Sequence, residues 1–391
     1  MLTVVGGTYF EVCHDPKWHE LYGSGLRGAI ALSGHVSDIS FKTCVGNDAI
    51  NLANAICNSF NIKPDFVLIP ETIVFEYYHP LTKPLFYPSD FLNFKTRMPD
   101  VSAESILVYG QIEAEVKVSG SYVVYDPQNG ISYKFTGSTA THLALVLNHR
   151  EALLLSGLTD QDNLEEVGKA LLKNEEAEVV VIKNGPHGAL VVDCSGTHII
   201  PVFKTSSVWP IGSGDIFSAA FAWKWALEKL PAAEAALLAS RFTAQYCQSR
   251  ILPLPVAPNI FQQLRRNTHA QKLYLAGPFF TVAERWLINE LRCKLIEFGN
   301  DVFSPLHDVG RGGPDQVVGK DLAAIENADV VLAVLNGEDP GTIFEIGYAK
   351  ALKKRVVVLA ENTLENDLTM LIGSGCEITN DFTTAVYMAS W

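Results

Sequence analysis

The sequence predicts an α/β protein with two domains, each built on a parallel sheet. Short β-branched runs of buried-strand length alternate with amphipathic helical patterns. Three such runs are residues 179–185, 329–335 and 355–360. A Pro-rich and then polar segment at 251–271 interrupts the alternation, and the 391-residue length suits two or three domains. We therefore expect domains at 1–258 and 272–391, joined by a linker at 259–271.

The composition limits the partners and the compartment. Apolar residues make up 48% of the chain and charged residues 19%, which is enough apolar material for buried cores. The formal charge of −13 disfavours nucleic acid as the main partner. The seven cysteines are scattered without a C-x-x-C pair, and no stretch resembles a signal peptide or a membrane span. We expect a cytoplasmic protein with small-molecule ligands and no nucleic-acid or membrane partner.

The second domain divides into strands and helices in regular alternation. We expect strands at 272–276, 301–304, 329–335 and 355–360, helices at 281–297, 315–327 and 342–353, and a shorter final helical region. Five parallel strands with crossover helices give a flavodoxin-like sandwich, which binds ligands at the carboxyl ends of its strands. Residues just past these ends are therefore candidates for substrate binding. They include Gly277, Pro278 and Phe279 after the first strand and Ser304 after the second.

A carboxylate, Glu345, stands among apolar residues in the helix that opens beside Asp339. Burying a carboxylate without a partner costs several kcal/mol, so a functional role is attractive. Retaining cleavage of a glycosidic bond needs one carboxylate as nucleophile and a second acid about 5 to 5.5 Å away. Glu345, Asp321 and Asp339 could supply such a set. Asp339 before Pro340 is equally a good helix N-cap, and Asp321 could be a solvated helix residue.

Three blocks of this domain, "YLAGPFF", "DLAAIENADVVLAVLNG" and "DPGTIFEIGYAKA", resemble the nucleoside 2-deoxyribosyltransferases and their nucleotide N-hydrolase relatives over residues 272–391. The resemblance implies that Glu345 is the nucleophile and that Asp321 handles the proton of the leaving base. It also implies that Asp339 contacts the base and that Tyr274 orients the nucleophile. It requires no cofactor and implies a homo-oligomer, because family pockets are completed by a neighbouring subunit. The C-terminal segment departs from the family pattern, so transferase and hydrolase both stay open.

In the first domain, "PIGSGDIFSAAFAW" at 210–223 is a Gly-rich turn that opens an apolar helix. Main-chain N–H groups at a helix N-terminus, loosened here by Gly212 and Gly214, form an anion site for a transferring phosphoryl group. Asp215 stands where a hydroxyl could lose its proton. The alternative is an ordinary turn with an acidic first-turn residue that favours the helix dipole.

Four blocks in this domain, "DPQN" (126–129), "NHRE" (148–151), "IKNGPHGALV" (182–191) and "GSGD", resemble the ribokinase-like, PfkB-type carbohydrate and nucleoside kinases over about residues 1–258. The resemblance implies a three-layer α/β/α fold, with ATP and Mg²⁺ as cofactors and Asp215 as the catalytic base. It implies further ATP and phosphate contacts by Gly212, Ser213, Gly214 and Gly185, and by Asn148 and Glu151, with Glu151 reaching the metal through water. The polar residues that the family has before the anion hole are replaced here by Trp209, Pro210 and Ile211.

The segment Gly23 to Gly28, "GSGLRG", matches the dinucleotide fingerprint G-x-G-x-x-G, but we reject that assignment. The fingerprint must directly follow a strand, whereas the first strand is expected to end near Phe10. In the kinase resemblance this Gly-rich turn lies near the acceptor substrate. A hydroxyl-binding role for Gly25 and a packing role are both open.

Together these patterns predict a bifunctional enzyme of nucleoside metabolism. One domain would cleave or exchange the N-glycosidic bond of a (deoxy)nucleoside through a covalent glycosyl-glutamate. The other would be an ATP-dependent sugar or nucleoside kinase. The alternative is a nucleoside or nucleotide N-glycosidase whose kinase-like domain is a nucleotide-binding regulatory module. The sequence identifies neither the base nor the sugar.

Overall fold

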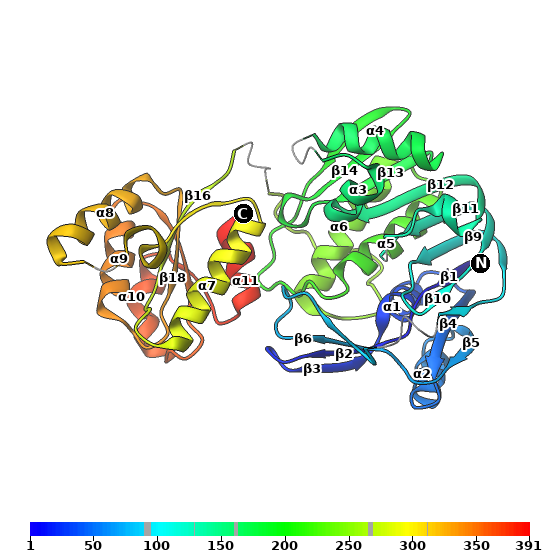
Figure 1. The fold of residues 1–391 in the computed structure, drawn as a ribbon, viewed down its shortest axis with the longest axis horizontal. Coiled ribbons are helices and arrows are strands. Elements are labelled where there is room, and N and C mark those ends of the chain that lie inside the picture. Colours follow the sequence, from blue (N-terminus) through cyan, green and yellow to red (C-terminus); the bar gives the residue numbers. More distant parts are fainter. Residues whose placement is uncertain (90–94, 129, 160–162, 265–268, 311) are drawn as a thin grey trace. The chain divides into compact units, whose positions relative to one another are not determined.

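The computed structural model describes residues 1–391 except 90–94, 129, 160–162, 265–268 and 311. The chain divides into two compact units (Figure 1). The N-terminal unit comprises Met1–Thr205 with Trp209–Arg265, and the C-terminal unit comprises Ser206–Val208 with Arg266–Trp391. The linker predicted at 259–271 lies partly outside the described residues, and its bounds stay a prediction. Within the described part of the chain, no helix is long and apolar enough to span a membrane.

The N-terminal unit is built on a nine-stranded sheet of order β15-β14-β13-β12-β11-β9-β1-β4-β5. Its neighbouring strands are parallel except at β13–β14 and β14–β15, which are antiparallel. The strands are β1 Leu2–Val5, β4 Ile39–Gly46, β5 Lys63–Ile69, β9 Val101–Tyr109, β11 Val118–Asp126, β12 Thr139–Asn148, β13 Val179–Lys183, β14 Ala189–Asp193 and β15 Gly196–Ile200.

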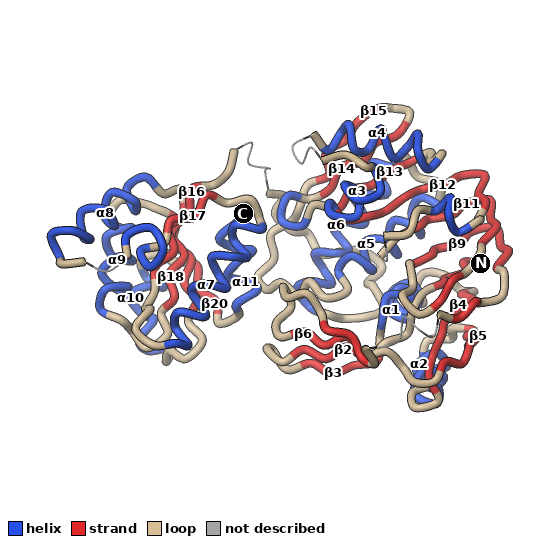
Figure 2. The backbone as a smooth tube through the Cα atoms, viewed as in Figure 1, coloured by secondary structure: helices blue, strands red, loops and turns tan. Residues whose placement is uncertain are grey.

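Helices cover both faces of this sheet, because alternate residues of its strands supply two separate cores. One core joins the sheet to α1 Gly23–Leu32, α2 Ile50–Ser59, α5 Ser213–Ala222 and α6 Ala232–Ser249. The other joins it to α3 His149–Ser156 and α4 Leu164–Glu175. The predicted three-layer, ribokinase-like α/β/α architecture is therefore confirmed (Figure 2).

A small four-stranded sheet, of order β3-β2-β6-β7, corrects one prediction. Its strands are β2 Phe10–Cys13, β3 Trp18–Leu21, β6 Val74–Tyr77 and β7 Leu85–Tyr87, and a two-stranded sheet pairs β8 Thr96–Arg97 with β10 Ala114–Glu115. The first strand ends at Val5 and not near Phe10, because residues 6–9 leave the nine-stranded sheet and Phe10 begins β2, which belongs to a different sheet. Gly23–Gly28 also lie in helix α1, directly after β3, and not in a turn.

The C-terminal unit holds a fully parallel five-stranded sheet of order β17-β16-β18-β19-β20. Its strands are β16 Lys272–Ala276, β17 Asp301–Phe303, β18 Val330–Val334, β19 Arg355–Leu359 and β20 Glu377–Thr379. In chain order this is 2-1-3-4-5, so the predicted flavodoxin-like fold is confirmed. The helices are α7 Val282–Glu297, α8 Pro314–Asn327, α9 Pro340–Ala351, α10 Thr369–Gly373 and α11 Phe382–Ser390.

Candidate active sites

The first candidate site joins helix α9 to strand β16 in the C-terminal unit. The Tyr274 hydroxyl donates a 2.6 Å hydrogen bond to Glu345 Oε1. Tyr274 is fully buried and alternates with Leu273 and Leu275, so the strand points its phenol toward the face that α9 covers. The carboxylate that sequence reasoning singled out is therefore held in place by the strand residue predicted to orient it.

The ionisation of Glu345 is strongly perturbed. Burial raises the pKa of Glu345 to about 7, against the opposing effect of the Tyr274 hydrogen bond. The charges of Asp321 and Asp339 raise this pKa further, so both of the other carboxylates predicted for this site lie close enough to affect Glu345. Burial also raises the pKa of Asp321, and its buried Oδ1 atom has no hydrogen-bond partner among the described residues. Asp321 is therefore not merely a solvated helix residue.

Asp339 is the N-cap of helix α9. Its Oδ2 atom accepts hydrogen bonds from Thr342 N at 2.7 Å and from Thr342 Oγ1 at 2.9 Å. Pro340 follows as the first helical residue. The capping alternative is thus confirmed, while the contact of Asp339 with a base stays a prediction.

The loop after β16 contains the predicted substrate residues Gly277, Pro278 and Phe279. A Cβ atom at Gly277 would lie 2.7 Å from Ile288 Cδ1, so a larger residue would not fit without movement. The ring of Phe279 stacks on Phe280, with centroids 5.6 Å apart, and Phe280 is exposed. The loop therefore offers an aromatic surface near the carboxyl end of the strand.

Ser304 follows β17 as predicted, but it is fully buried. Its main-chain N–H donates to Asp308 Oδ2 at 2.8 Å, and its hydroxyl lies 3.1 Å from His307 Nδ1. These contacts fix the loop after the strand. A substrate contact by Ser304 stays a prediction.

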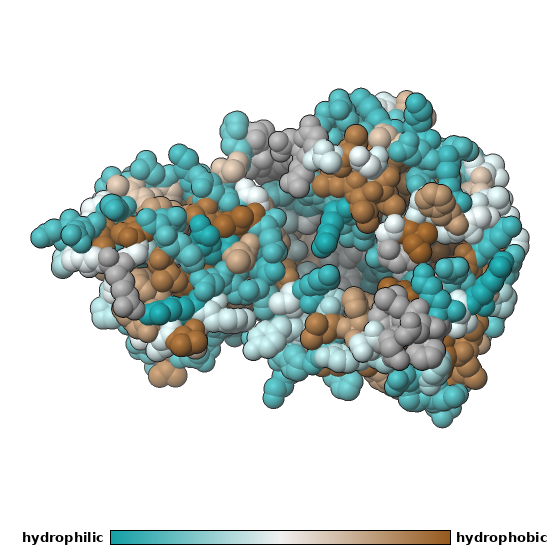
Figure 3. Space-filling view, viewed as in Figure 1, coloured by the Kyte–Doolittle hydropathy of each residue, from teal (hydrophilic) through white to brown (hydrophobic). Residues whose placement is uncertain are grey.

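Exposed apolar side chains provide candidate contact surfaces for the predicted homo-oligomer. Figure 3 shows apolar patches among the hydrophilic surface, and large exposed apolar residues of the C-terminal unit include Ile343, Phe344, Met370 and Ile372. Such patches are typical of interaction surfaces. The oligomeric state itself stays a prediction.

If Glu345 is the nucleophile, as the resemblance implies, replacing Tyr274 with Phe should shift the pH dependence of base release to higher pH. The Tyr274 hydrogen bond lowers the pKa of Glu345, and only the ionised carboxylate can attack. For the unchanged protein, kcat/KM should rise with pH toward a plateau through a midpoint near pH 7, since Glu345 has a pKa of about 7, and should fall again where Asp321, the proton donor implied by the resemblance, ionises. One hydrogen bond to a charged group contributes roughly 1.5–3 kcal/mol, so we expect a loss of kcat/KM of roughly 10- to 100-fold below the plateau. Measuring kcat/KM across this range checks the shift, and an unmoved midpoint would contradict it.

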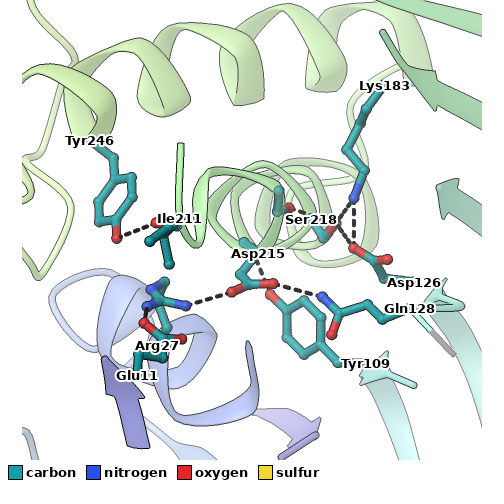
Figure 4. Close-up of polar contacts among 11 residues, drawn as sticks. Glu11, Arg27, Tyr109, Asp126, Gln128, Lys183, Ile211, Asp215, Ser218 and Tyr246 are labelled. Carbon is teal, nitrogen blue, oxygen red and sulfur yellow. Dashed lines mark hydrogen bonds and ion pairs between the residues drawn. The ribbon is translucent and has the colours of Figure 1, made fainter. Parts of the chain in front are cut away.

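The second candidate site surrounds Asp215, in the first turn of helix α5 (Figure 4). Both of its carboxylate oxygens are engaged. Arg27 Nη1 donates to Oδ2 at 2.7 Å and Gln128 Nε2 donates to Oδ1 at 2.7 Å. The Tyr109 hydroxyl donates to the main-chain oxygen of Asp215 at 2.6 Å. Asp215 is only 7% exposed, so the predicted base is a buried carboxylate with a hydrogen-bond donor at each oxygen.

Arg27, from helix α1, is the centre of this network and is also buried. Its Nη2 atom forms an ion pair with Glu11. Burial raises the pKa of Glu11 above its ordinary value, and the Arg27 charge offsets only part of this rise. The guanidinium packs against Gly212, where a Cβ atom would lie 2.2 Å from Nε. Gly212 also has a φ of 77°, in the left-handed region that favours glycine. Position 212 therefore requires glycine for two reasons: its backbone is left-handed, and a side chain there would overlap the guanidinium of Arg27.

Asn148 and Glu151 form a capping box at the start of helix α3. Glu151 N donates to Asn148 Oδ1 at 2.9 Å, and Asn148 N donates to Glu151 Oε2 at 2.8 Å. Burial and the nearby Asp126 charge raise the pKa of Glu151 to about 7. Within the described ranges, no group of three or more His, Cys, Asp or Glu side chains could hold a metal. Glu151 Oε1 has no hydrogen bond to the described residues, so it is free to accept one from metal-bound water.

Two predicted glycines lie apart from these networks. Gly185 is exposed and follows β13 with a φ of 51°, as a turn residue. Gly25 is buried in α1, where a Cβ atom would lie 2.5 Å from the carbonyl carbon and oxygen of Gly6. Close backbone packing accounts for Gly25. Its substrate contact, like the nucleotide contact of Gly185, stays a prediction, and Asn129 of the "DPQN" block lies outside the described residues.

Sequence reasoning did not identify Arg27, Glu11, Gln128 or Lys183. Two of them, Arg27 and Lys183, could have been found from a pattern in the sequence. Arg27 is the only charged residue of α1, "GSGLRGAIAL", and Lys183 is the only charged residue of β13, "VVVIK". A lone charge in an otherwise apolar element of this kind requires a buried partner.

Comparisons with known families agree with the two folds. The model of the nucleoside 2-deoxyribosyltransferase family matches residues 273–380. The model of the pfkB family of carbohydrate kinases matches residues 90–253. A search of curated proteins finds no match at the significance threshold.

Solved structures with similarity to the chain include three kinases. An aminoimidazole riboside kinase from Salmonella enterica, complexed with aminoimidazole riboside and an ATP analog, is 15% identical over 64% of this chain and 94% of that chain, with a TM-score of 0.48. A nucleoside kinase from Methanocaldococcus jannaschii is 15% identical over 65% and 94%, with a TM-score of 0.47. A ribokinase from Thermotoga maritima is 16% identical over 65% and 96%, with a TM-score of 0.43. The chain therefore carries a match to the pfkB family of carbohydrate kinases at residues 90–253, followed by a match to the nucleoside 2-deoxyribosyltransferase family at residues 273–380, in the order that the sequence motifs predicted.

Proposed function

We propose that the C-terminal unit cleaves or exchanges the N-glycosidic bond of a nucleoside or nucleotide, with Glu345 as the nucleophile. The supporting observation is the buried Glu345 carboxylate held by Tyr274 at 2.6 Å and influenced by the Asp321 charge. A nucleophilic carboxylate beside a second acid is the arrangement that retaining glycosidic cleavage requires.

In the first step, a Glu345 oxygen bonds to the anomeric carbon while the bond from that carbon to the base nitrogen breaks. The electron pair stays on the base, which takes a proton from Asp321, whose burial favours the protonated form. In the second step, water or a second base attacks the anomeric carbon and gives its proton to Asp321. As this bond forms, the glycosyl ester bond breaks and Glu345 leaves as a carboxylate, stabilised by the Tyr274 hydroxyl.

Product analysis tests this proposal. The full chain is incubated with a panel of nucleosides, deoxynucleosides and their 5′-phosphates, with and without a second base, and the products are separated by chromatography. We expect release of the base from at least one of them. A new nucleoside carrying the added base would identify a transferase, and release of free sugar alone would identify a hydrolase. No base release from any member of the panel would contradict the proposal.

For the N-terminal unit we propose ATP-dependent phosphorylation of a sugar or nucleoside hydroxyl. Asp215 would take the hydroxyl proton as the oxygen attacks the γ-phosphorus, and ADP would leave. Mg²⁺ would neutralise charge on the triphosphate, with Glu151 holding it through water. The turn at Gly212–Gly214 would stabilise the transferring phosphoryl group through main-chain N–H groups.

A second candidate function for this unit is a nucleotide-binding regulatory module. It is favoured by one observation: both Asp215 oxygens are occupied, by Arg27 and Gln128, and the carboxylate is buried. An acceptor hydroxyl would have to share one of these oxygens with Arg27 or Gln128 inside a buried site. The measurement is ADP formation with a panel of sugars and nucleosides. ADP with a phosphorylated product, lost in Asp215→Asn, supports the kinase, whereas ATP binding without ADP formation supports the regulatory module.

A further inference from the structure

A cavity of about 350 Å³ opens in the N-terminal unit away from the Asp215 network. Its lining includes Val108, Val118 and Tyr125, which belong to the core that the sheet shares with α3 and α4. Helix α5, which carries Asp215, packs against the core on the other face. None of the described lining residues belongs to the predicted ATP, phosphate or acceptor sites. Small-molecule pockets measure about 300–1,000 Å³, so this cavity is large enough to be a separate ligand site.

The cavity exists because two connections of the sheet lack covering α-helices. The parallel neighbours β9 and β11 are joined by residues 110–117, and β11 and β12 by residues 127–138. A parallel crossover usually takes about a dozen residues or more and includes an α-helix. Here the first connection holds only β10, and the described part of the second holds only a 3-10 helix, Tyr133–Thr136. The apolar face of β9 and β11 is therefore left partly open.

One hydroxyl in the lining of this cavity lacks a partner. Tyr133 is only 5% exposed, and its hydroxyl oxygen is buried without a hydrogen bond to any described residue. Burial raises the pKa of the Tyr133 phenol, so the hydroxyl stays protonated and can donate. A buried hydroxyl without a hydrogen bond destabilises the folded state. A ligand with an acceptor atom would remove this cost.

The other hydroxyls of the described lining each have a partner. The Tyr125 hydroxyl, for example, donates to Ile131 O at 2.9 Å. The remaining ones belong to Tyr109, Thr136 and Ser138. The unpaired hydroxyl of Tyr133 is therefore an exception within this lining.

The segment that carries Tyr133 is held on both sides. Ser132 Oγ and Lys134 N donate to Glu175 Oε2 at 2.9 and 3.3 Å. Glu175 is itself buried, at the last residue of α4. The phenol is therefore preorganised, and little conformational freedom is lost when a ligand binds.

Aromatic rings form part of the cavity wall. The rings of Tyr125 and Tyr133 lie 5.4 Å apart at an angle of 59°. Phe135 also lines the cavity and is 88% exposed, so its ring lies on the open side. Aromatic rings pack favourably against other flat rings, in stacked or edge-to-face arrangements. These walls favour a flat ligand.

The charges of the lining limit the ligand further. Two cationic residues, Arg97 and Lys117, line the cavity with one carboxylate, Glu115. Like charges repel, so this excess of positive charge disfavours a cationic ligand.

We propose that this cavity binds a small flat aromatic or heteroaromatic molecule, neutral or anionic, whose acceptor oxygen or nitrogen takes the hydrogen bond of the Tyr133 hydroxyl. Free nucleobases and aromatic carboxylates share this chemistry. The site is independent of both proposed functions, because it uses neither Glu345 nor Asp215.

Hydrogen exchange of the full chain, titrated with uracil, adenine and benzoate, tests the proposal. The measurement is local, so nucleobase binding in the C-terminal unit does not obscure it. At least one of the three compounds should protect residues 110–118 and 131–138, and which one does so separates a nucleobase site from a carboxylate site. The non-planar cyclohexanecarboxylate and the cationic benzylamine should protect neither segment.

Two variants test the residues of the cavity. Tyr133→Phe should weaken binding by roughly 2- to 10-fold, the range expected for one lost neutral hydrogen bond. Without ligand, it should protect β9 and β11 at least as well as the unchanged protein, because it removes an unpaired hydroxyl. Phe135→Ala should also weaken binding by roughly 2- to 10-fold, through loss of ring packing. The controls Tyr122→Phe, on β11, and Leu154→Ala, on the exposed side of α3, lie outside the cavity and should bind like the unchanged protein.

Several results would overturn the proposal. Absence of protection of both segments by all three planar compounds would overturn the site itself. Equal protection by cyclohexanecarboxylate or benzylamine would overturn the ligand class. Unchanged affinity in Tyr133→Phe, or weaker protection of β9 and β11 in this variant without ligand, would show that the hydroxyl has a structural role and no role in binding.

Discussion

Replacing Glu345 with Ala should lower base release by at least about three orders of magnitude while the fold survives. The substitution removes the side-chain carboxylate that forms the glycosyl ester in the proposed mechanism. It does not remove a structural contact of comparable importance, because among the described residues the Glu345 carboxylate has one hydrogen-bond partner, the Tyr274 hydroxyl. Initial rates of base release and a circular dichroism melting curve check the two parts of this expectation.

Two further variants make the result specific. Glu345→Gln keeps an oxygen that can accept the Tyr274 hydrogen bond but cannot act as the nucleophile, so it should be nearly as inactive as Ala. Glu297→Ala removes an exposed carboxylate from the end of α7 and should leave the rate unchanged. Base release by the Glu345 variants at the rate of the unchanged protein would refute the assignment.

Replacing Arg27 with Met should destabilise the N-terminal unit by about 3–5 kcal/mol near neutral pH, the range measured when one partner of a buried ion pair is removed. The substitution leaves Glu11 and Asp215 as buried carboxylates without a cation. The folded-state pKa of Glu11 is already raised by burial, and without Arg27 it would rise further. Since protonation then favours the folded state, the loss of stability should grow as the pH rises and shrink in mild acid.

Hydrogen exchange of the N-terminal unit measures this effect without requiring the whole chain to unfold in one step. The double variant Arg27→Met/Glu11→Gln should recover part of the loss, because one buried charge is removed with the cation. Arg97→Met, at an exposed arginine, should change stability by no more than about 0.5 kcal/mol. Protection in Arg27→Met equal to that of the unchanged protein would show that the buried pairs contribute nothing to the fold.

The C-terminal fold was predictable because its signals are local. Three of its strands are continuous apolar runs buried on both faces, and α9 begins at an Asp-Pro pair that caps and initiates it. The predicted element ends agree with the structure within two residues. The fifth strand, Glu377–Thr379, was expected without a position, because three half-buried residues form no recognisable pattern.

The network around Asp215 was less predictable because its contacts are long-range. The Gly-rich turn before Asp215 identified the carboxylate, but Arg27 is 188 residues away in the chain. The order of the nine strands brings α1 and α5 together, and no local pattern encodes that order. An arginine in a helix is usually a surface residue, so its burial could not be inferred from the residue type.

Mass spectrometry of the protein quenched during turnover tests the central claim most directly. A deoxynucleoside substrate identified by product analysis is mixed with the full chain, the reaction is stopped in acid, and the digested peptides are weighed. A covalent intermediate predicts that the peptide containing Glu345 gains the mass of the sugar, and that Glu345→Gln shows no such gain. Sugar attached to a different residue, or turnover at an undiminished rate by Glu345→Gln, would contradict the assignment of Glu345 as the nucleophile.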